Sequence, residues 1–157
     1  MERLPQQYQQ KNCVKFFHQM DELRKSRYVC GVLLWNEFND LLCIIDSTGK
    51  LNLPKGKEDY DDFKDKKTTG FRELGEEGGI KLSKTDLENY NEYIEVKHTK
   101  RIRLYKVNNY PKSTVNLNHT QHGEVKELCW LPQSELKNTE YNGMKFSLML
   151  KRTIKYL

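Results

Sequence analysis

The sequence has no long hydrophobic run, and nowhere do its apolar residues approach the roughly 20 that a membrane-spanning helix needs. Its first 25 residues are rich in Gln, Lys, Glu and Asp, so they lack the hydrophobic core of a secretory signal peptide. Internal repeats and low-complexity linkers are also missing. We therefore expect a cytoplasmic protein without a membrane partner.

Cysteine is sparse and has none of the spacings that hold zinc or form a disulfide framework. The four cysteines include no CxxC pair. Cys30 and Cys43 lie inside apolar runs, and Cys129 lies beside Trp130. These surroundings are typical of reduced core thiols in a cytosolic protein, so the pattern excludes a secreted disulfide scaffold.

The 157 residues suffice for one compact domain with its own core. Hydrophobic residues are 36% and charged residues 31% of the chain, and the 27 basic and 22 acidic side chains leave a net charge of +5. A mild positive excess suits a phosphate-rich partner such as RNA or a nucleotide. A Lys-rich solvated surface explains the same excess, so charge alone does not decide.

Hydrophobic periodicity predicts two parts, an N-terminal helical extension over residues 1–27 and a main domain over residues 28–157. Short Val-, Leu- and Ile-rich runs alternate with turn residues in the main domain, and a Gly- and acid-rich loop over 54–80 runs into a helix. The predicted strands are 29–35, 41–45, 51–53, 93–96, 102–107 and 125–131, with a loop over 108–123, a short helix over 132–136 and a last helix over 145–157. This order indicates an α/β sandwich with a mixed sheet.

The helix around residues 72–80 places three carboxylates, Glu73, Glu76 and Glu77, on one face. Clustered carboxylates repel one another, and hard oxygen ligands suit Mg²⁺ or Mn²⁺. Arg72 precedes the cluster and could orient one carboxylate by a charge-assisted hydrogen bond. An exposed acidic helix face is the alternative reading of the same residues.

A second feature lies upstream of this helix, where Leu53-Pro-Lys-Gly-Lys57 forms a glycine loop. Residues 72–80 fill every defined position of R-E-U-x-E-E-x-G-U, where U is aliphatic. Together the two segments resemble the signature box of the Nudix hydrolases, G-x5-E-x7-R-E-U-x-E-E-x-G-U, with Gly56 as the opening glycine. The resemblance implies a Nudix α/β/α sandwich and a pyrophosphohydrolase that uses Mg²⁺ or Mn²⁺.

The loop departs from the family pattern. Five residues after Gly56 comes Asp62 instead of glutamate, and nine residues instead of seven then lead to Arg72. Counting back from Arg72 places Lys64 at the glutamate position. In the family this glutamate supports the loop and helix and can contribute to the metal site, and its counterpart here is Asp62 or Asp65.

The resemblance also implies roles for individual residues. Glu76 and Glu77 would bind the metal, together with the backbone carbonyl of Gly56 or of Lys55. Glu73 would complete the metal site or help to deprotonate the attacking water. Arg72 and Gly79 would be structural within the motif.

Two lysines and a downstream segment complete the expected site. Lys55 and Lys57 could pair with substrate phosphates, although Lys57 could equally be a solvated side chain. Some Nudix enzymes take their general base from outside the box, and Glu124 is the candidate here, with Glu127 as the alternative. His119 and His122 flank the same loop and are expected to face the substrate or solvent.

The Pro-Lys-Gly-Lys spelling resembles that of mRNA-decapping Nudix enzymes, and the length suits the compact ones of large DNA viruses. The last helix would present Lys145, Lys151, Arg152 and Lys155 on one side, a basic stripe that could bind the RNA body or could simply be solvated. The expected activity is cleavage of the 5′ cap of mRNA with release of methylated GDP.

Small-molecule substrates are the alternative: dinucleoside polyphosphates, diphosphoinositol polyphosphates or nucleotide sugars. A non-catalytic Nudix-fold binding module is disfavoured because all three glutamates of the helix are present. Aromatic residues that could stack on a cap are Trp35, Tyr60, Phe63, Tyr105 and Tyr110.

Overall fold

The computed structural model describes residues 28–58, 65–121 and 124–157. The predicted N-terminal helical extension, residues 1–27, lies outside these ranges, as do Tyr60, Asp62, Phe63 and Lys64. Among the described residues no helix is long and apolar enough to cross a membrane.

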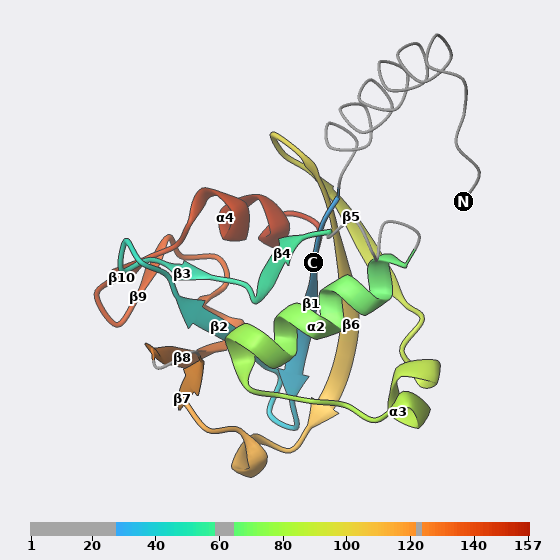
Figure 1. Cartoon of the computed structure of the whole chain (residues 1–157). Coiled ribbons are helices and arrows are strands. Elements are labelled where there is room, and N and C mark those ends of the chain that lie inside the picture. The colour runs from blue at the N-terminus through green and yellow to red at the C-terminus, as the bar shows by residue number, and fades with distance from the viewer. Residues whose placement is uncertain (1–27, 59–64, 122–123) are drawn as a thin grey trace, which may run out of the picture.

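One mixed eight-stranded sheet forms the centre of the molecule (Figure 1). Its main path runs β5-β6-β1-β2-β8-β7, with β3 added to β2 and β4 added to β1. Among the described strands of this sheet, β1 and β6 pair in parallel, and the other pairs are antiparallel. The strands are β1 (Val29–Asn36), β2 (Asp40–Ile45), β3 (Leu51–Asn52), β4 (Lys55–Lys57), β5 (Tyr93–Lys97), β6 (Arg101–Tyr110), β7 (Asn118–Gln121) and β8 (Glu124–Pro132).

Helices cover both faces of this sheet, because successive side chains of a strand point to opposite sides. In β1, Val32 and Leu34 pack into one apolar core with residues of α2 (Lys66–Gly78), whereas Leu33 packs into a second core with residues of α4 (Leu148–Ile154). The predicted α/β sandwich with a mixed sheet is therefore confirmed.

Two glycines allow other parts of the backbone to approach the central strand β1 closely. A Cβ atom on Gly70 would lie 2.9 Å from the backbone oxygen of Gly31, closer than real Cβ atoms approach. A Cβ atom on Gly31 would lie 2.4 Å from the backbone oxygen of Pro54. The helix backbone therefore packs on β1, and the chain leading into β4 passes close to the same strand.

The C-terminal third differs from the sequence prediction. The predicted loop over 108–123 contains the end of β6 and the strand β7, which pairs with β8. The predicted helix over 145–157 is shorter, because Ser147 is the N-cap of α4 and accepts a hydrogen bond from the backbone N–H of Leu150. Lys145 instead lies in β10 (Met144–Lys145), which forms a small hairpin with β9 (Glu140–Tyr141). A short helix that the sequence did not predict, α3 (Lys84–Asn89), follows α2.

None of the described cysteines forms a disulfide. Cys30 and Cys43 are buried, and Cys43 lies opposite the half-buried Cys129 in the β2–β8 ladder. Burial raises the pKa of the Cys43 and Cys129 thiols above the ordinary value. Both sulfurs therefore stay protonated and unreactive at neutral pH.

Candidate active site

Helix α2 is capped at both ends. At its start Asp65 is the N-cap, and its carboxylate accepts hydrogen bonds from the backbone N–H of Thr68 (3.1 Å) and from the Thr68 hydroxyl (2.5 Å). At its end Gly79 has a φ of 68°. Its N–H donates to the carbonyl of Gly75 at 3.1 Å, so it closes the helix in the left-handed conformation that glycine adopts most readily.

Glu73 lies directly against the glycine loop. A Cβ atom on Gly56 would stand 2.1 Å from Oε1 and 2.2 Å from Cδ of Glu73, so only glycine leaves space for this carboxylate. Gly56 is held in β4 by pairing with Cys30 of β1. The two halves of the sequence motif therefore meet at this contact.

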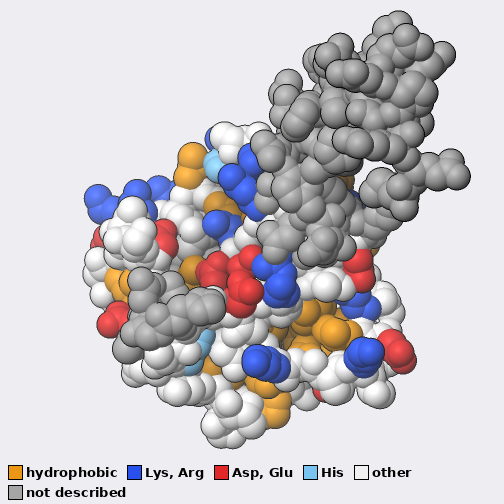
Figure 2. All heavy atoms as spheres, in the orientation of Figure 1, with side chains coloured by type: hydrophobic (Ala, Val, Ile, Leu, Met, Phe, Trp, Pro, Cys, Tyr) orange, Lys and Arg blue, Asp and Glu red, His pale blue; other side chains and the backbone are white. Residues whose placement is uncertain are grey.

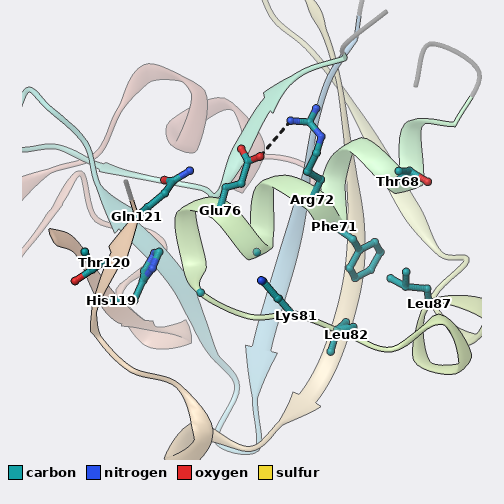
Figure 3. A pocket seen from close by; sticks show the side chains of 12 residues that line it. Thr68, Phe71, Arg72, Glu76, Lys81, Leu82, Leu87, His119, Thr120 and Gln121 are labelled. Carbon is teal, nitrogen blue, oxygen red and sulfur yellow. Dashed lines mark ion pairs between the residues drawn. The ribbon is translucent and has the colours of Figure 1, made fainter. Parts of the chain in front are cut away.

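Arg72 holds the carboxylates from the outer side of the helix. Its Nη1 lies 3.3 Å from Oε1 of Glu73 and 3.6 Å from Oε1 of Glu76 (Figure 3). Its Nη2 donates to the backbone oxygen of Lys57 at 3.5 Å. The guanidinium thus connects α2 to β4 and orients two of the three glutamates of the helix.

The carboxylates line a hollow of about 400 Å³, here called the acidic hollow. Glu73, Glu76 and Glu77 of α2 face Glu127 of β8 across it, and Lys55 of β4 lies on its wall. The other lining residues are Ile44, Ile45, Asp46, Ser47, Asn52 and Gln121. Figure 2 shows Asp and Glu side chains gathered at the centre of this face, with Lys and Arg side chains beside them.

Of the two candidates for the general base, only Glu127 can be placed. Its carboxylate lines the acidic hollow with the glutamates of α2. Glu124 begins β8 and pairs with Gln121 through the backbone, but its side chain lies outside the described part of the structure. The predicted role of Glu124 therefore stays a prediction.

His119 supports the end of α2. Its Nε2 donates a hydrogen bond to the backbone oxygen of Glu77 at 2.5 Å. A Cβ atom on Gly79 would lie 3.0 Å from Cγ of His119, so the imidazole packs on the glycine. His119 thus fixes β7 against the last turn of α2. Its half-buried side chain also lines a hollow beside that helix, so the expectation that it faces substrate or solvent stays a prediction. His122 lies outside the described ranges.

The two lysines that were predicted to bind substrate phosphates differ in their surroundings. Lys55 lines the acidic hollow, whereas the exposed Lys57 does not. Lys55 also lies near His98, at the turn between β5 and β6. Burial and the positive charges of Arg152 and Lys55 lower the pKa of His98. Arg152 belongs to α4, whose N-cap residue Ser147 donates a backbone hydrogen bond to Leu51 of β3 at 2.8 Å.

The predicted basic stripe is divided between two elements. Lys151 and Arg152 lie on α4 and Lys155 is its C-cap residue, whereas Lys145 belongs to the β9–β10 hairpin. All four side chains are exposed. The buried residues of α4 are Met149, Leu150 and Thr153, so the helix is amphipathic as predicted.

Two further carboxylates, one of them in the acidic hollow, have no signal in the sequence. Asp46 lines the acidic hollow from the β2–β3 turn, and hydrogen bonds from Thr48 and Lys50 lower its pKa, although partial burial alone would raise it. Glu58 follows β4 and is 2% exposed. Its Oε1 accepts a hydrogen bond from the backbone N–H of Tyr28 at 2.8 Å, and its buried Oε2 has no hydrogen-bond partner among the described residues. Neither residue lies at a position of the motif, so only their three-dimensional surroundings reveal them.

The donor set of the acidic hollow suits a hard divalent cation, because it consists of carboxylate oxygens with room left for water and phosphate. In the described part of the chain, no three His, Cys, Asp or Glu side chains yet stand in a metal-binding arrangement. Glu73 and Glu76 turn toward the guanidinium of Arg72 instead. The residues therefore fit Mg²⁺ or Mn²⁺ in kind.

Comparison with known proteins identifies the fold. No family model matches the sequence, and no curated protein matches it. Among solved structures, the chain is similar to the Nudix domain of Shewanella oneidensis NrtR in complex with ADP-ribose, with a TM-score of 0.58, 15% identity and coverage of 82% of this chain and 83% of that chain.

Two MutT structures are also similar. One comes from a study of MutT from Aliivibrio salmonicida and Vibrio cholerae, with a TM-score of 0.53, 16% identity and coverage of 83% of this chain and 94% of that chain. The other, from Methanosarcina mazei Go1, has a TM-score of 0.52, 20% identity and coverage of 82% of this chain and 88% of that chain. The chain therefore has the Nudix hydrolase fold.

Proposed function

On this Nudix fold, we propose that the chain is a metal-dependent pyrophosphohydrolase that cleaves a diphosphate linkage in a nucleotide-type substrate. One observation supports the proposal above all: the acidic hollow brings Glu73, Glu76 and Glu77 of α2 together with Glu127 of β8 and Lys55 of β4. These residues are far apart in the sequence, and their chemistry matches what a diphosphate and a divalent cation require. The similarity to a Nudix domain solved in complex with ADP-ribose agrees with a nucleotide substrate.

The residues of the acidic hollow have separate roles in binding the metal and the substrate phosphates. Glu76, Glu77 and Glu73 would hold Mg²⁺ or Mn²⁺, with the backbone carbonyl of Gly56 as a further oxygen ligand. When bound, the metal supplies charge neutralisation at the phosphate oxygens and lowers the pKa of a bound water. Lys55 pairs with a phosphate oxygen, because this cationic residue lines the hollow.

The general base is a carboxylate from outside α2. Glu127 lines the hollow and accepts the proton of the attacking water, with Glu124 as the second candidate. Arg72 orients Glu73 and Glu76 by its contacts of 3.3 Å and 3.6 Å. Gly56 leaves the space in which the carboxylate of Glu73 lies.

For the substrate we propose the 5′ cap of mRNA, hydrolysed with release of methylated GDP. The exposed cations of α4 would bind the RNA body by salt-dependent contacts with phosphates. The position of α4 supports this, because its N-cap residue Ser147 donates a backbone hydrogen bond to Leu51 of β3 at 2.8 Å, and the next residue of β3, Asn52, lines the acidic hollow. Figure 2 shows Lys and Arg side chains above the acidic cluster, on the side of α4.

Dinucleoside polyphosphates, diphosphoinositol polyphosphates and nucleotide sugars are the alternative substrates. They also contain a diphosphate linkage, but they need no cationic surface beyond the hollow. Removal of the basic side chains of α4 should therefore weaken activity on capped RNA but not on these small molecules.

The first experiment is an activity assay with Mg²⁺ and with Mn²⁺ on a capped RNA and on a panel of these small molecules. The Glu76→Gln/Glu77→Gln variant is the control for metal-dependent chemistry. Release of methylated GDP much faster than turnover of any small molecule supports decapping. Preference for a small molecule assigns the alternative substrate, and turnover equal to that of the control contradicts the proposed activity.

A matched pair of variants tests the role of α4. Lys151→Gln/Arg152→Gln removes two exposed charges of the basic helix, and Lys84→Gln/Lys137→Gln removes two exposed charges elsewhere. If RNA lies on α4, the first variant raises KM for capped RNA about tenfold and flattens its salt dependence, while the second changes neither. Equal effects of the two variants would exclude the proposed RNA surface.

A further inference from the structure

The strand β4 carries two residues of the proposed site and is only three residues long. Lys55 lines the acidic hollow, and Gly56 lies against the carboxylate of Glu73. Among the described strands β4 pairs with β1 alone, and it runs beside both β1 and α2 (Figure 1). A strand this short has few ladder hydrogen bonds, so its position depends on contacts made by neighbouring residues.

Glu58, which directly follows β4, lengthens the pairing with β1. Its Oε1 accepts a hydrogen bond from the backbone N–H of Tyr28 at 2.8 Å. Its own backbone N–H donates to the backbone oxygen of Tyr28 at 3.1 Å. Because Tyr28 directly precedes β1, these two hydrogen bonds fasten the end of β4 to the start of β1.

The same carboxylate joins β4 to α2. Lys66 is the first residue of α2, and its Nζ lies 3.9 Å from Oε1 of Glu58. The ammonium group also lies 4.4 Å from the centre of the Tyr28 ring. The side chains of Glu58 and Lys66 are 3% and 22% exposed, and salt screens such a partly buried pair less than an exposed one. One carboxylate therefore links the ends of β4, β1 and α2.

The position of β4 matters for the glutamates of α2 because the two elements touch without spare room. A Cβ atom on Gly56 would stand 2.1 Å from Oε1 of Glu73. Arg72 donates from Nη2 to the backbone oxygen of Lys57 at 3.5 Å, and its Nη1 lies 3.3 Å from Oε1 of Glu73. A displacement of β4 is therefore transmitted to the Glu73 carboxylate through both contacts.

Stability alone gives little reason for a carboxylate at position 58. The residue is 2% exposed, and transfer of a carboxylate from water into the protein interior is costly. An apolar side chain of similar volume often stabilises such a place at least as well. An apolar side chain cannot, however, accept a hydrogen bond from Tyr28 and attract Lys66 at the same time. The carboxylate thus contributes fixed geometry between β4 and α2.

We propose that Glu58 is a positioning residue, an inference that rests on the proposed function. It fixes β4 relative to α2, and it thereby places Glu73 and the backbone carbonyl of Gly56 for a divalent cation. Glu58 is not among the residues that line the acidic hollow. It therefore acts through β4 and α2, and not by contact with substrate or metal.

Mn²⁺ binding by calorimetry and amide hydrogen exchange by NMR test this inference on the full chain. Glu58→Leu removes the carboxylate and keeps a buried side chain of similar size. Glu58→Gln keeps an oxygen for Tyr28 but removes the charge that faces Lys66, and it is the second variant if Glu58→Leu does not fold. The matched control is Glu95→Leu, which removes the 2.6 Å ion pair with Arg103 in strands β5 and β6.

Glu58→Leu should raise the Kd for Mn²⁺ about tenfold or more, the effect typical of residues that orient metal ligands. It should also speed hydrogen exchange of the Gly56 and Lys57 amides. Glu58→Gln should change both quantities in the same direction but less, and Glu95→Leu should change neither. An unchanged Kd in Glu58→Leu overturns the inference, even if the midpoint of thermal unfolding falls, because the role of Glu58 is then purely structural. An equal loss of Mn²⁺ affinity in Glu95→Leu overturns it as well.

Turnover is measured separately, so that the two proposals can fail independently. If the wild type hydrolyses a panel substrate and Glu58→Leu binds Mn²⁺ equally well, only the positioning role is refuted. If Glu58→Leu loses Mn²⁺ affinity and the wild type hydrolyses no panel substrate, only the proposed activity is refuted. A wild type that binds no Mn²⁺ contradicts both, because there is then no metal site for Glu58 to position.

Discussion

The carboxylate of Glu73 occupies the position that a side chain at Gly56 would need, because a Cβ atom on Gly56 would stand 2.1 Å from Oε1 of Glu73. This contact joins α2 to β4 at the edge of the acidic hollow. The glycine of the loop and the first glutamate of the helix are therefore a single structural unit, although they are far apart in the sequence.

Gly56→Ala should displace the carboxylate of Glu73 and disturb the proposed site. Overpacking of this kind costs about 1–3 kcal/mol of stability. We expect at least a tenfold loss of metal-dependent turnover in a protein that still folds, measured by kinetics and by thermal unfolding.

Gly75→Ala is the matched control, since an added Cβ atom there meets nothing closer than 3.6 Å. This change should raise the free energy of unfolding by about 0.5–1 kcal/mol. If Gly56→Ala turned over substrate as fast as Gly75→Ala, the contact with Glu73 would have no functional role.

Divalent cations should stabilise the fold through the clustered glutamates. A ligand present at 100 times its Kd stabilises the folded state by about 2.7 kcal/mol, so Mn²⁺ should raise the midpoint of thermal unfolding. In Glu76→Gln/Glu77→Gln this rise should vanish. The metal-free variant should be as stable as the wild type or slightly more so, because two like charges are removed. An equal Mn²⁺ effect in both proteins would exclude Glu76 and Glu77 as the site.

Gly79 and His119 should depend on each other energetically. Gly79→Ala forces alanine to a φ of 68° and into contact with the imidazole at 3.0 Å, so it should cost at least about 1–2 kcal/mol. His119→Ala should cost about 1 kcal/mol, because the hydrogen bond to the carbonyl of Glu77 is lost. In a double-mutant cycle by urea unfolding, Gly79→Ala should cost less when His119 is absent. Strict additivity would mean that the ring does not constrain position 79.

The N-cap of α2 predicts a pH effect. The hydrogen bond from the Thr68 hydroxyl is the main cause that lowers the pKa of Asp65 below its ordinary value of 3.8. A lowered carboxyl pKa adds stability above the unfolded value, and this contribution disappears as the pH falls through the folded value. Asp65→Ala should therefore cost about 1 kcal/mol at pH 7, and the difference from the wild type should shrink below pH 3.8. A difference that stays constant from pH 7 to pH 3 would argue against this ionised cap.

Local features of the fold could be predicted from the sequence. The strands around Val32 and Leu42 lie in apolar runs, and the spacing of Glu73, Glu76 and Glu77 places them on one helix face. The end of α2 at Gly79 follows from the glycine itself. Such features depend on neighbouring residues, and backbone geometry converts their spacing into structure directly.

The partners of the site depend on contacts between distant segments. Pairing of β8 with β2 and β7 brings Glu127 and Gln121 to the acidic hollow, and the sequence prediction had assigned β7 to a loop. The burial of Glu58 similarly depends on Tyr28, 30 residues away. The sequence by itself determined the helix and its carboxylate face, because helical periodicity is local. Only the tertiary structure decided which residues complete the hollow, because strand pairing and burial join segments that are far apart in the chain.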